Sequence, residues 1–133
     1  MRHPRDYTVN EAWIVFRLNE APVRTERDGD LDVVCLMDAA SCYILGMEFV
    51  AAGAAEVPAP VAEGLIETGR AAANGLPKKL WLSSGLGAAR IAAVAKRAGI
   101  EAERVPDKDL TAFLSEARQG FREHLSRRQW RKL

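Results

Sequence analysis

Acidic side chains are the residues of this chain whose types and spacing could bind a metal. Asp38 follows an apolar run, where a carboxylate suits either a metal ligand or a turn in which it accepts backbone amide hydrogen bonds; we favour the turn. Asp28, Asp30 and Asp32 are spaced like ligands, but no calcium-binding loop follows. The Gly and Glu that such a loop requires are missing at their offsets, so a solvated hairpin is predicted.

Two adjacent serines, Ser83 and Ser84, are candidate nucleophiles if a general base lies near them. The histidines are His3 and His124, and the sequence holds no Gly-x-Ser-x-Gly turn. A serine hydrolase is therefore not favoured.

Two glycines, Gly85 and Gly87, lie between a predicted strand and a predicted helix, where a phosphate can bind a helix N-terminus. Arg90 stands where a third small residue is expected, and no P-loop lysine follows. The glycines are therefore interpreted as a tight turn between strand and helix.

The C-terminal segment is strongly basic. Residues 118–133 hold six Lys and Arg side chains against Glu123 alone, and Trp130 lies among the last of them. Basic residues beside an aromatic can contact phosphates and stack on bases, whereas cations near a helix C-terminus are also favoured by the helix dipole. We favour the second interpretation. A weak nucleic-acid contact remains a hypothesis, carried by Arg90, Arg118, Arg122, Arg127, Arg128 and Lys132.

The composition indicates one globular domain. With 133 residues and 48% hydrophobic content one core is expected, and a net charge of +1 gives no global field typical of a nucleic-acid binder. Cys35 and Cys42 lack metal-ligand spacing, which favours a reduced, cytoplasmic protein. The N-terminus lacks the apolar stretch of a signal peptide, and no apolar run reaches the roughly 18–20 residues of a membrane span.

Hydrophobic periodicity predicts five strands and three helices. The strands, rich in β-branched and aromatic residues, are expected at 12–18, 32–37, 43–50, 78–82 and 101–105. The nearly all-apolar second strand predicts a central position covered on both faces. Helical stripes are expected at 61–72, at 88–98 and from 110 to about 125, with Asp107 or Asp109 capping the last helix. The order β-β-β-α-β-α-β-α predicts an α/β fold, a five-stranded mixed sheet with helices packed on it.

That order and four motifs resemble the catalytic core of retroviral integrases and transposases, a branch of the RNase H-like superfamily. Residues 13–16 (WIVF) resemble the opening strand, in which a Trp lies three positions before a metal-binding Asp. Residues 38–46 (DAASCYILG) resemble the turn Asp-x-x-Ser-Arg-Tyr-Ile-x-Gly, with Cys42 in place of Arg.

Two further motifs extend the resemblance toward the C-terminus. Residues 82–85 (LSSG), followed by Ala98-Gly99-Ile100, resemble the Thr-Asp-Asn-Gly block and its downstream Gly-Ile. Residues 119–125 (QGFREHL) resemble the final helix motif Glu-x-Phe-x-x-x-Leu. The resemblance covers about residues 12–128 and implies a single domain over 1–133 with a basic tail at 127–133.

Departures from the family pattern decide what function the resemblance implies. The positions that match the family's three metal-binding carboxylates hold Phe16, Ser83 and Gln119. Two-metal phosphoryl transfer needs clustered anionic oxygens, which a phenyl ring cannot supply and a hydroxyl or an amide supplies weakly. The resemblance therefore implies a chain without catalytic residues, metal site or cofactor.

Three functions stay open, and we favour the first. It is a catalytically inactive integrase-core-like domain that serves as a binding or assembly module; related cores often dimerise, so a homodimer and nucleic acid are its expected partners, with no membrane. The second is a nuclease that uses Mg²⁺ or Mn²⁺ held by the displaced carboxylates Asp38, Glu63 and Glu116. The third is a small α/β domain that binds a protein or a small ligand.

Overall fold

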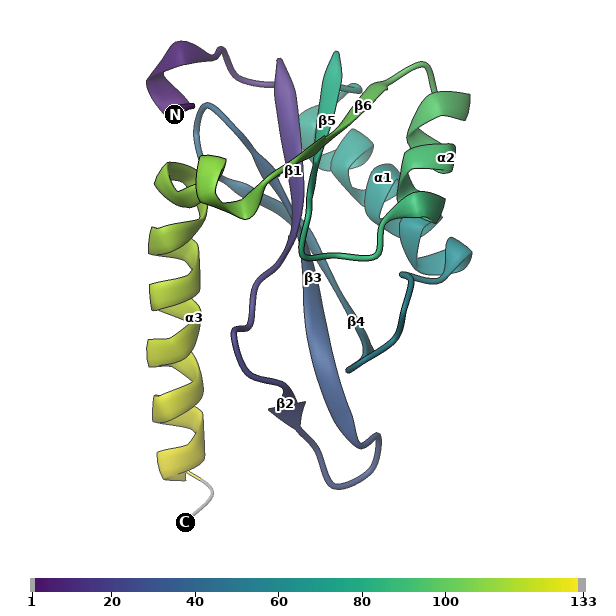
Figure 1. Cartoon of the computed structure of the whole chain (residues 1–133). Helices are drawn as coiled ribbons and strands as arrows, with labels where there is room; N and C mark the ends of the chain where they lie inside the picture. Colours follow the sequence, from purple (N-terminus) through teal and green to yellow (C-terminus); the bar gives the residue numbers. More distant parts are fainter. Residues whose placement is uncertain (1, 132–133) are drawn as a thin grey trace.

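A mixed sheet with helices on both faces forms the framework of the computed structural model, which describes residues 2–131 and the side chains up to residue 124 (Figure 1). The strands are β1 (Ala12–Arg17), β2 (Val23–Arg24), β3 (Asp30–Asp38), β4 (Ile44–Ala51), β5 (Lys79–Ser83) and β6 (Glu101–Val105). The α-helices are α1 (Ala59–Ala73), α2 (Ala89–Arg97) and α3 (Thr111–Arg131), and short 3-10 turns lie at Pro4–Asp6 and Asp107–Asp109.

The five long strands lie side by side in the order β4-β3-β1-β5-β6. β3 pairs antiparallel with β1 and with β4, whereas β1–β5 and β5–β6 are parallel pairs. Cys35 of β3 pairs with both Phe16 of β1 and Met47 of β4, so β1 and β4 lie on opposite sides of β3. β3 is therefore an interior strand, and its residues 33–38 are buried, as the apolar run predicts.

A sixth strand corrects the five-stranded prediction. The two residues of β2 pair with Asp30 and Leu31, in a segment whose polar composition gave no strand signal. Asn19 separates β2 from β1: its buried side chain accepts a hydrogen bond from Val33 N at 2.7 Å and donates to Asp32 Oδ1 at 2.9 Å. Side-chain hydrogen bonds of this kind satisfy the ladder positions that the chain leaves open at the break.

The core is divided by the sheet into two layers. On one face, α1 and α2 cover Trp13, Leu36 and Leu80. On the other, α3 covers Phe16 and Trp81. The α1 layer is so tight that a Cβ added at Gly69 would lie 2.5 Å from Leu36 Cδ2 and 2.8 Å from Trp13 Cζ3. Trp13 and Trp81, on opposite faces of the sheet, are both buried in the core.

The N-terminal segment adds to the α3 layer, which the sequence did not predict. The ring of Tyr7 lies edge-on to Trp81, with centroids 4.8 Å apart, and Phe113 of α3 meets the same indole at 5.6 Å. The guanidinium of Arg2 lies 4.9 Å from the Trp81 ring centroid and bonds Glu103 of β6. Within the described residues, no helix combines the length and apolar character needed to cross a membrane.

Candidate functional site

Two of the three positions that match the family's metal-binding carboxylates lie together at the carboxyl ends of β1 and β5. Val15 is the last β1 residue paired with β5, opposite Leu82, so Phe16 and Ser83 follow side by side. Ile14 and Trp81, the preceding pair on that face, both lie in the α3 layer. Because side chains alternate along a strand, Phe16 and Ser83 point to the α3 face as well.

A fixed cation lies over Phe16. The guanidinium carbon of Arg118 is 5.8 Å from the centroid of the buried Phe16 ring. The same guanidinium donates from Nε at 3.2 Å and from Nη2 at 2.9 Å to the carbonyl oxygen of Arg17. Two hydrogen bonds to one backbone oxygen fix the charge at the end of β1. The neighbouring Gln119 is exposed and donates to Glu123 at 3.4 Å, so α3 presents Arg118 to this end of the sheet.

Ser83 is buried and bonded to a carboxylate that comes from beyond β6. Its Oγ donates to Oδ1 of Asp107, the backbone amide of Gly85 lies 3.4 Å from the same oxygen, and the amide of Asp107 lies 3.3 Å from Ser84 Oγ. Asp107 was one of two residues, with Asp109, expected to cap the last helix; its carboxylate instead joins the end of β5 to the turn after β6. A hydroxyl that donates to a carboxylate, with no histidine among its partners, is a structural link rather than an activated nucleophile.

The turn after β5 is closed by a second carboxylate. Glu56 accepts a hydrogen bond at 2.8 Å from the amide of Ala89, the first residue of α2. The chain passes so close that a Cβ added at Gly87 would lie 1.9 Å from the carbonyl oxygen of Ala55. The first amide of the helix is thus already bonded to an anion, which supports the interpretation of Gly85 and Gly87 as a tight turn.

The buried Asp38 is the centre of a partly buried hydrogen-bond network at the turn between β3 and β4. Its Oδ1 accepts from Asn10 N at 2.7 Å, and its Oδ2 accepts from Ser41 N at 2.9 Å and Ser41 Oγ at 2.7 Å. The side chain of Asn10 accepts in turn from Trp13 Nε1 at 2.6 Å. The predicted role of Asp38 as an acceptor of backbone amides is confirmed, and this use of both oxygens leaves little capacity for a metal.

The two cysteines are free thiols in unreactive surroundings. Burial raises the pKa of Cys35 to about 12. Burial, and then the negative charges of Glu116 and Asp38, raise the pKa of Cys42. A raised pKa keeps the thiol protonated near neutral pH and lowers its nucleophilicity.

The other acidic candidates, Glu63 and Glu116, lie on helices that cover opposite faces of the sheet. Glu63 is on α1, 3.9 Å from Arg97 of α2, and these helices cover the opposite face from α3. Glu116 is exposed on α3. Among the residues with described side chains, no group of three or more His, Cys, Asp or Glu is placed to hold a metal ion.

The basic candidates do not form one surface. Arg90 is exposed on α2, on the face of the sheet opposite to α3. Arg122 pairs with Glu20 at 2.8 Å, and Arg118 is bonded to the Arg17 carbonyl. The side chains of Arg127 and Arg128, and all of Lys132, lie outside the described part of the chain.

Comparison with known proteins gives a structural likeness and no sequence relative. No protein-family model matches the chain, and no curated protein matches it. The fold is similar to a chain in the cryoEM structure of a simian T-cell lymphotropic virus intasome in complex with PP2A regulatory subunit B56 gamma, with a TM-score of 0.62 and 12% identity. The match covers 92% of this chain and 42% of that one, so this chain spans less than half of its neighbour's length. At this identity the likeness shows the fold alone.

Sequence reasoning missed the groups that shape this end of the sheet. Asp107 carried the signal of a helix cap, and its pairing with Ser83 depends on β5 and β6 becoming neighbours in space. Arg118 was singled out for its charge, whereas its hydrogen bonds to Arg17 depend on how α3 crosses β1. No local sequence pattern reports either contact.

Proposed function

We propose that this chain is a catalytically inactive domain of the RNase H-like, integrase- and transposase-core type that serves as a binding or assembly module. The strand order β4-β3-β1-β5-β6 with helices on both faces supports the family assignment, as does the likeness to a chain of an intasome structure over 92% of this chain. The motifs at 13–16 and 38–46 lie on β1 and on the turn that leads into β4.

The single observation that carries the inactive assignment is the guanidinium of Arg118 over Phe16. In the resembled family a carboxylate at the position of Phe16 binds a divalent metal. Here that position is an apolar ring, and a fixed positive charge lies 5.8 Å from it. Like charges repel strongly where little water lies between them, so this end of the sheet disfavours a second cation.

A role in assembly, unlike nucleic-acid cleavage by two metal ions, requires no metal site. A likeness to one chain of a multi-component complex supports this role. A nucleic-acid contact would depend mainly on the C-terminal tail, because Arg118 and Arg122 already have partners within the chain. We therefore place any nucleic-acid affinity in residues 127–133.

A cleavage assay tests the inactive assignment. The full chain is incubated with DNA, RNA and hybrid duplexes in Mg²⁺ or Mn²⁺, next to the variants Asp38→Ala and Asp107→Asn. We expect no cleavage above a protein-free control in any of them. Cleavage by the full chain that is lost in either variant would contradict the proposal and favour the metal-dependent nuclease.

The nuclease is kept as a second candidate because of Asp107. It is the one carboxylate bonded to Ser83 at the end of β5, next to Phe16. A single carboxylate bonded to a hydroxyl is fewer ligands than a two-metal site requires, so we rank this candidate below the assembly module.

A salt series tests the tail. Fluorescence anisotropy with labelled single-stranded and duplex DNA compares the full chain with one that ends at Ser126. If the tail binds phosphates, affinity falls with salt and the shorter chain loses most of it, because each neutralised phosphate releases counterions. A flat salt slope, or equal affinity of the two chains, would remove nucleic acid from the proposal.

A further inference from the structure

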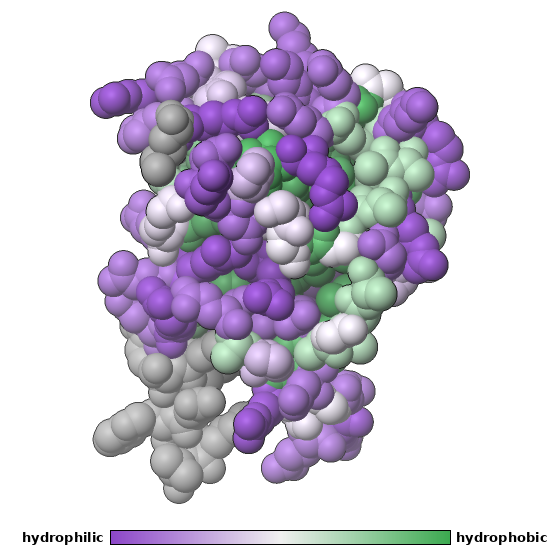
Figure 2. All heavy atoms as spheres, viewed as in Figure 1, coloured by the Kyte–Doolittle hydropathy of each residue, from purple (hydrophilic) through white to green (hydrophobic). Residues whose placement is uncertain are grey.

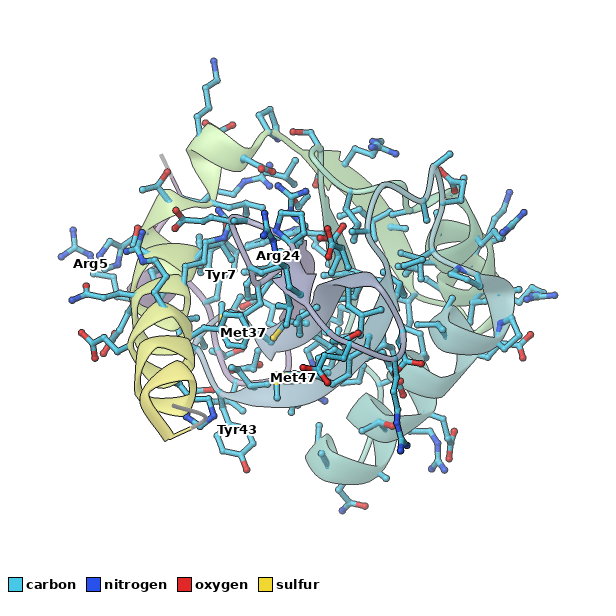
Figure 3. The ribbon with its side chains drawn as sticks, turned by 90° about the horizontal axis from the view of Figure 1, so that it is seen from below. Arg5, Tyr7, Arg24, Met37, Tyr43 and Met47 are labelled. Carbon is cyan, nitrogen blue, oxygen red and sulfur yellow. The ribbon has the colours of Figure 1, made fainter. Side chains whose placement is uncertain are left out.

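The edge strand β4 presents apolar side chains to solvent. Among the described residues, the exposed large hydrophobic side chains include Met47 and Phe49 of β4, which are 52% and 60% exposed, and Tyr43 just before the strand, which is 67% exposed. Met47 and Phe49 lie opposite the buried Cys35 and Val33 of β3, so they belong to the α3 face of the sheet. In Figure 3 Tyr43 points away from the body of the molecule beside α3, whereas Met37 lies inside it.

The other face of β4 is covered within the chain. A Cβ added at Gly46 would lie 3.0 Å from Thr68 Cγ2 of α1, and Val50 belongs to the layer under that helix. The strand is therefore held firmly from one side, while the α3 face beyond β3 stays open. A single covered face fixes the strand and leaves its edge available for pairing.

The backbone of β4 also offers regular hydrogen-bonding groups along this edge. Ala52 N donates to Asp30 O at 2.9 Å, so the pair 30–52 is hydrogen-bonded to β3. Alternation in an antiparallel ladder then directs the groups of residues 46, 48 and 50 to β3. The N–H and C=O groups of Met47, Phe49 and Ala51 point outward.

The usual protections of a free edge are weak here. Natural edges are blunted by Lys, Pro, bulges or short strands. β4 is eight residues long, holds neither Lys nor Pro and has Glu48 as its only charge. Its pairing with β3 shifts register between Leu36 and Met37, opposite its first residues, and the ladder from Gly46 to Ala51 is regular.

We infer that β4 pairs antiparallel with β4 of a second copy of this chain, about a two-fold axis at Phe49. This register uses only the regular segment, sets Phe49 against Phe49 of the second copy, and sets Met47 against Ala51 and Glu48 against Val50. An axis at Glu48 would place two carboxylates directly opposite, which destabilises a pair. An axis at Met47 would require residues 43–45, where the register shifts.

In this register two copies of β4 pair without opposing like charges and with apolar residues facing each other. This self-complementarity favours a second copy of the chain as the partner. The paired sheets would bury the two Phe49 rings and both Met47 side chains in one apolar strip on the α3 face. Aromatic cross-strand pairs stabilise sheets, and edge pairing adds main-chain hydrogen bonds. The inference deepens the proposed function, on which it rests, by naming the strand and the register through which two copies of the module would pair.

Sedimentation velocity over a concentration series tests the dimer. The full chain is compared with Phe49→Lys, which opposes two ammonium groups at the axis, and with Val9→Lys, which makes the same change at a side chain that is 72% exposed and lies outside β4. We expect a concentration-dependent dimer whose Kd rises at least about tenfold in Phe49→Lys and is unchanged in Val9→Lys. A chain that stays monomeric, or a dimer that Phe49→Lys leaves intact, would overturn the inference.

A backbone variant separates edge pairing from apolar contact. Phe49→Pro removes an N–H that points outward and is bonded to no β3 group in the inferred ladder, a position at which edge strands tolerate proline. The dimer should be lost while the circular dichroism spectrum is kept, and a dimer that survives would contradict strand pairing. Because cleavage is measured separately, a monomer without nuclease activity overturns the dimer alone, and an active nuclease overturns the proposed function alone.

Discussion

The two edges of the sheet are built differently. β6 is five residues long, carries Glu101, Glu103 and Arg104, and is tied to the N-terminal segment through Arg2 and Glu103. β4 is eight residues long and exposes Met47 and Phe49. In Figure 1 β6 crosses in front of β1 and β5, and hydrophilic side chains cover much of the same region in Figure 2.

The difference is that β6 is protected against pairing with a further strand, whereas β4 is not. Exposed charged side chains make addition of another strand to β6 unfavourable. An apolar strand with outward backbone groups favours such addition to β4. The charged edge at β6 and the apolar edge at β4 lead to different expectations for substitutions on the two sides.

The largest expected loss of stability lies on β5, the strand next to β6. Trp81→Ala removes an indole that is nearly fully buried between Tyr7 and Phe113. The free energy of unfolding should fall by about 3–5 kcal/mol, because the lost transfer energy and the residual cavity add. Urea denaturation followed by circular dichroism measures it. A loss below about 1 kcal/mol would show that the N-terminal segment does not close this side.

The turn that leads into β4 should be the next most sensitive. Asp38→Ala leaves the partly buried backbone amides of Asn10 and Ser41 without the acceptor that the buried carboxylate provides. We expect a loss of about 1–3 kcal/mol in unfolding free energy. Asp30→Ala, at an exposed residue of the same strand, is the matched control and should stay within about 0.5 kcal/mol of the original chain. Equal effects of the two variants would contradict the network described for Asp38.

On β3, the strand next to the open edge, the buried thiol of Cys35 should make the unfolding free energy fall at alkaline pH. The folded pKa of Cys35 is raised to about 12 from an ordinary value of 9.0. Its contribution is complete below pH 9 and is lost as pH rises toward 12, since the unfolded thiol ionises first. At pH 10 the loss is roughly 1 kcal/mol. Urea titrations at pH 8 and pH 10 measure this loss. The unfolding free energy should decrease less between the two pH values in Cys35→Ala than in the original chain, and equal decreases would contradict the burial of the thiol.

The smallest effect is expected at the open edge itself. Phe49→Ser at low protein concentration, where the chain is monomeric, should change unfolding free energy by no more than about 0.5 kcal/mol, because the ring is 60% exposed. Denaturant titration measures it at two protein concentrations. A loss near that of Trp81→Ala in the monomer would mean that Phe49 belongs to the core and that the two edges do not differ.

Periodicity predicted the elements well because local and tertiary preferences agree in them. The apolar run before Asp38 became the interior strand β3, and the helical stripe at 61–72 became α1. β2 was missed because two residues in a polar segment form a strand only when β3 lies beside them.

The candidate site was less predictable. The residue types at Phe16 and Ser83 were enough to question a metal site, and the parallel pairing of β1 with β5 places them as neighbours. The contacts that finish the site, Asp107 to Ser83 and Arg118 to Arg17, join residues far apart in the chain. Long-range contacts of this kind leave no periodic signal in the sequence.

Titration calorimetry with Mn²⁺ tests the central claim most directly, because the proposed assembly function needs no metal where β1 and β5 end. The full chain is titrated with Mn²⁺ next to Asp107→Asn, the variant that removes the carboxylate bonded to Ser83. The account predicts no saturable heat for either chain. Saturable binding by the full chain that Asp107→Asn abolishes would contradict it.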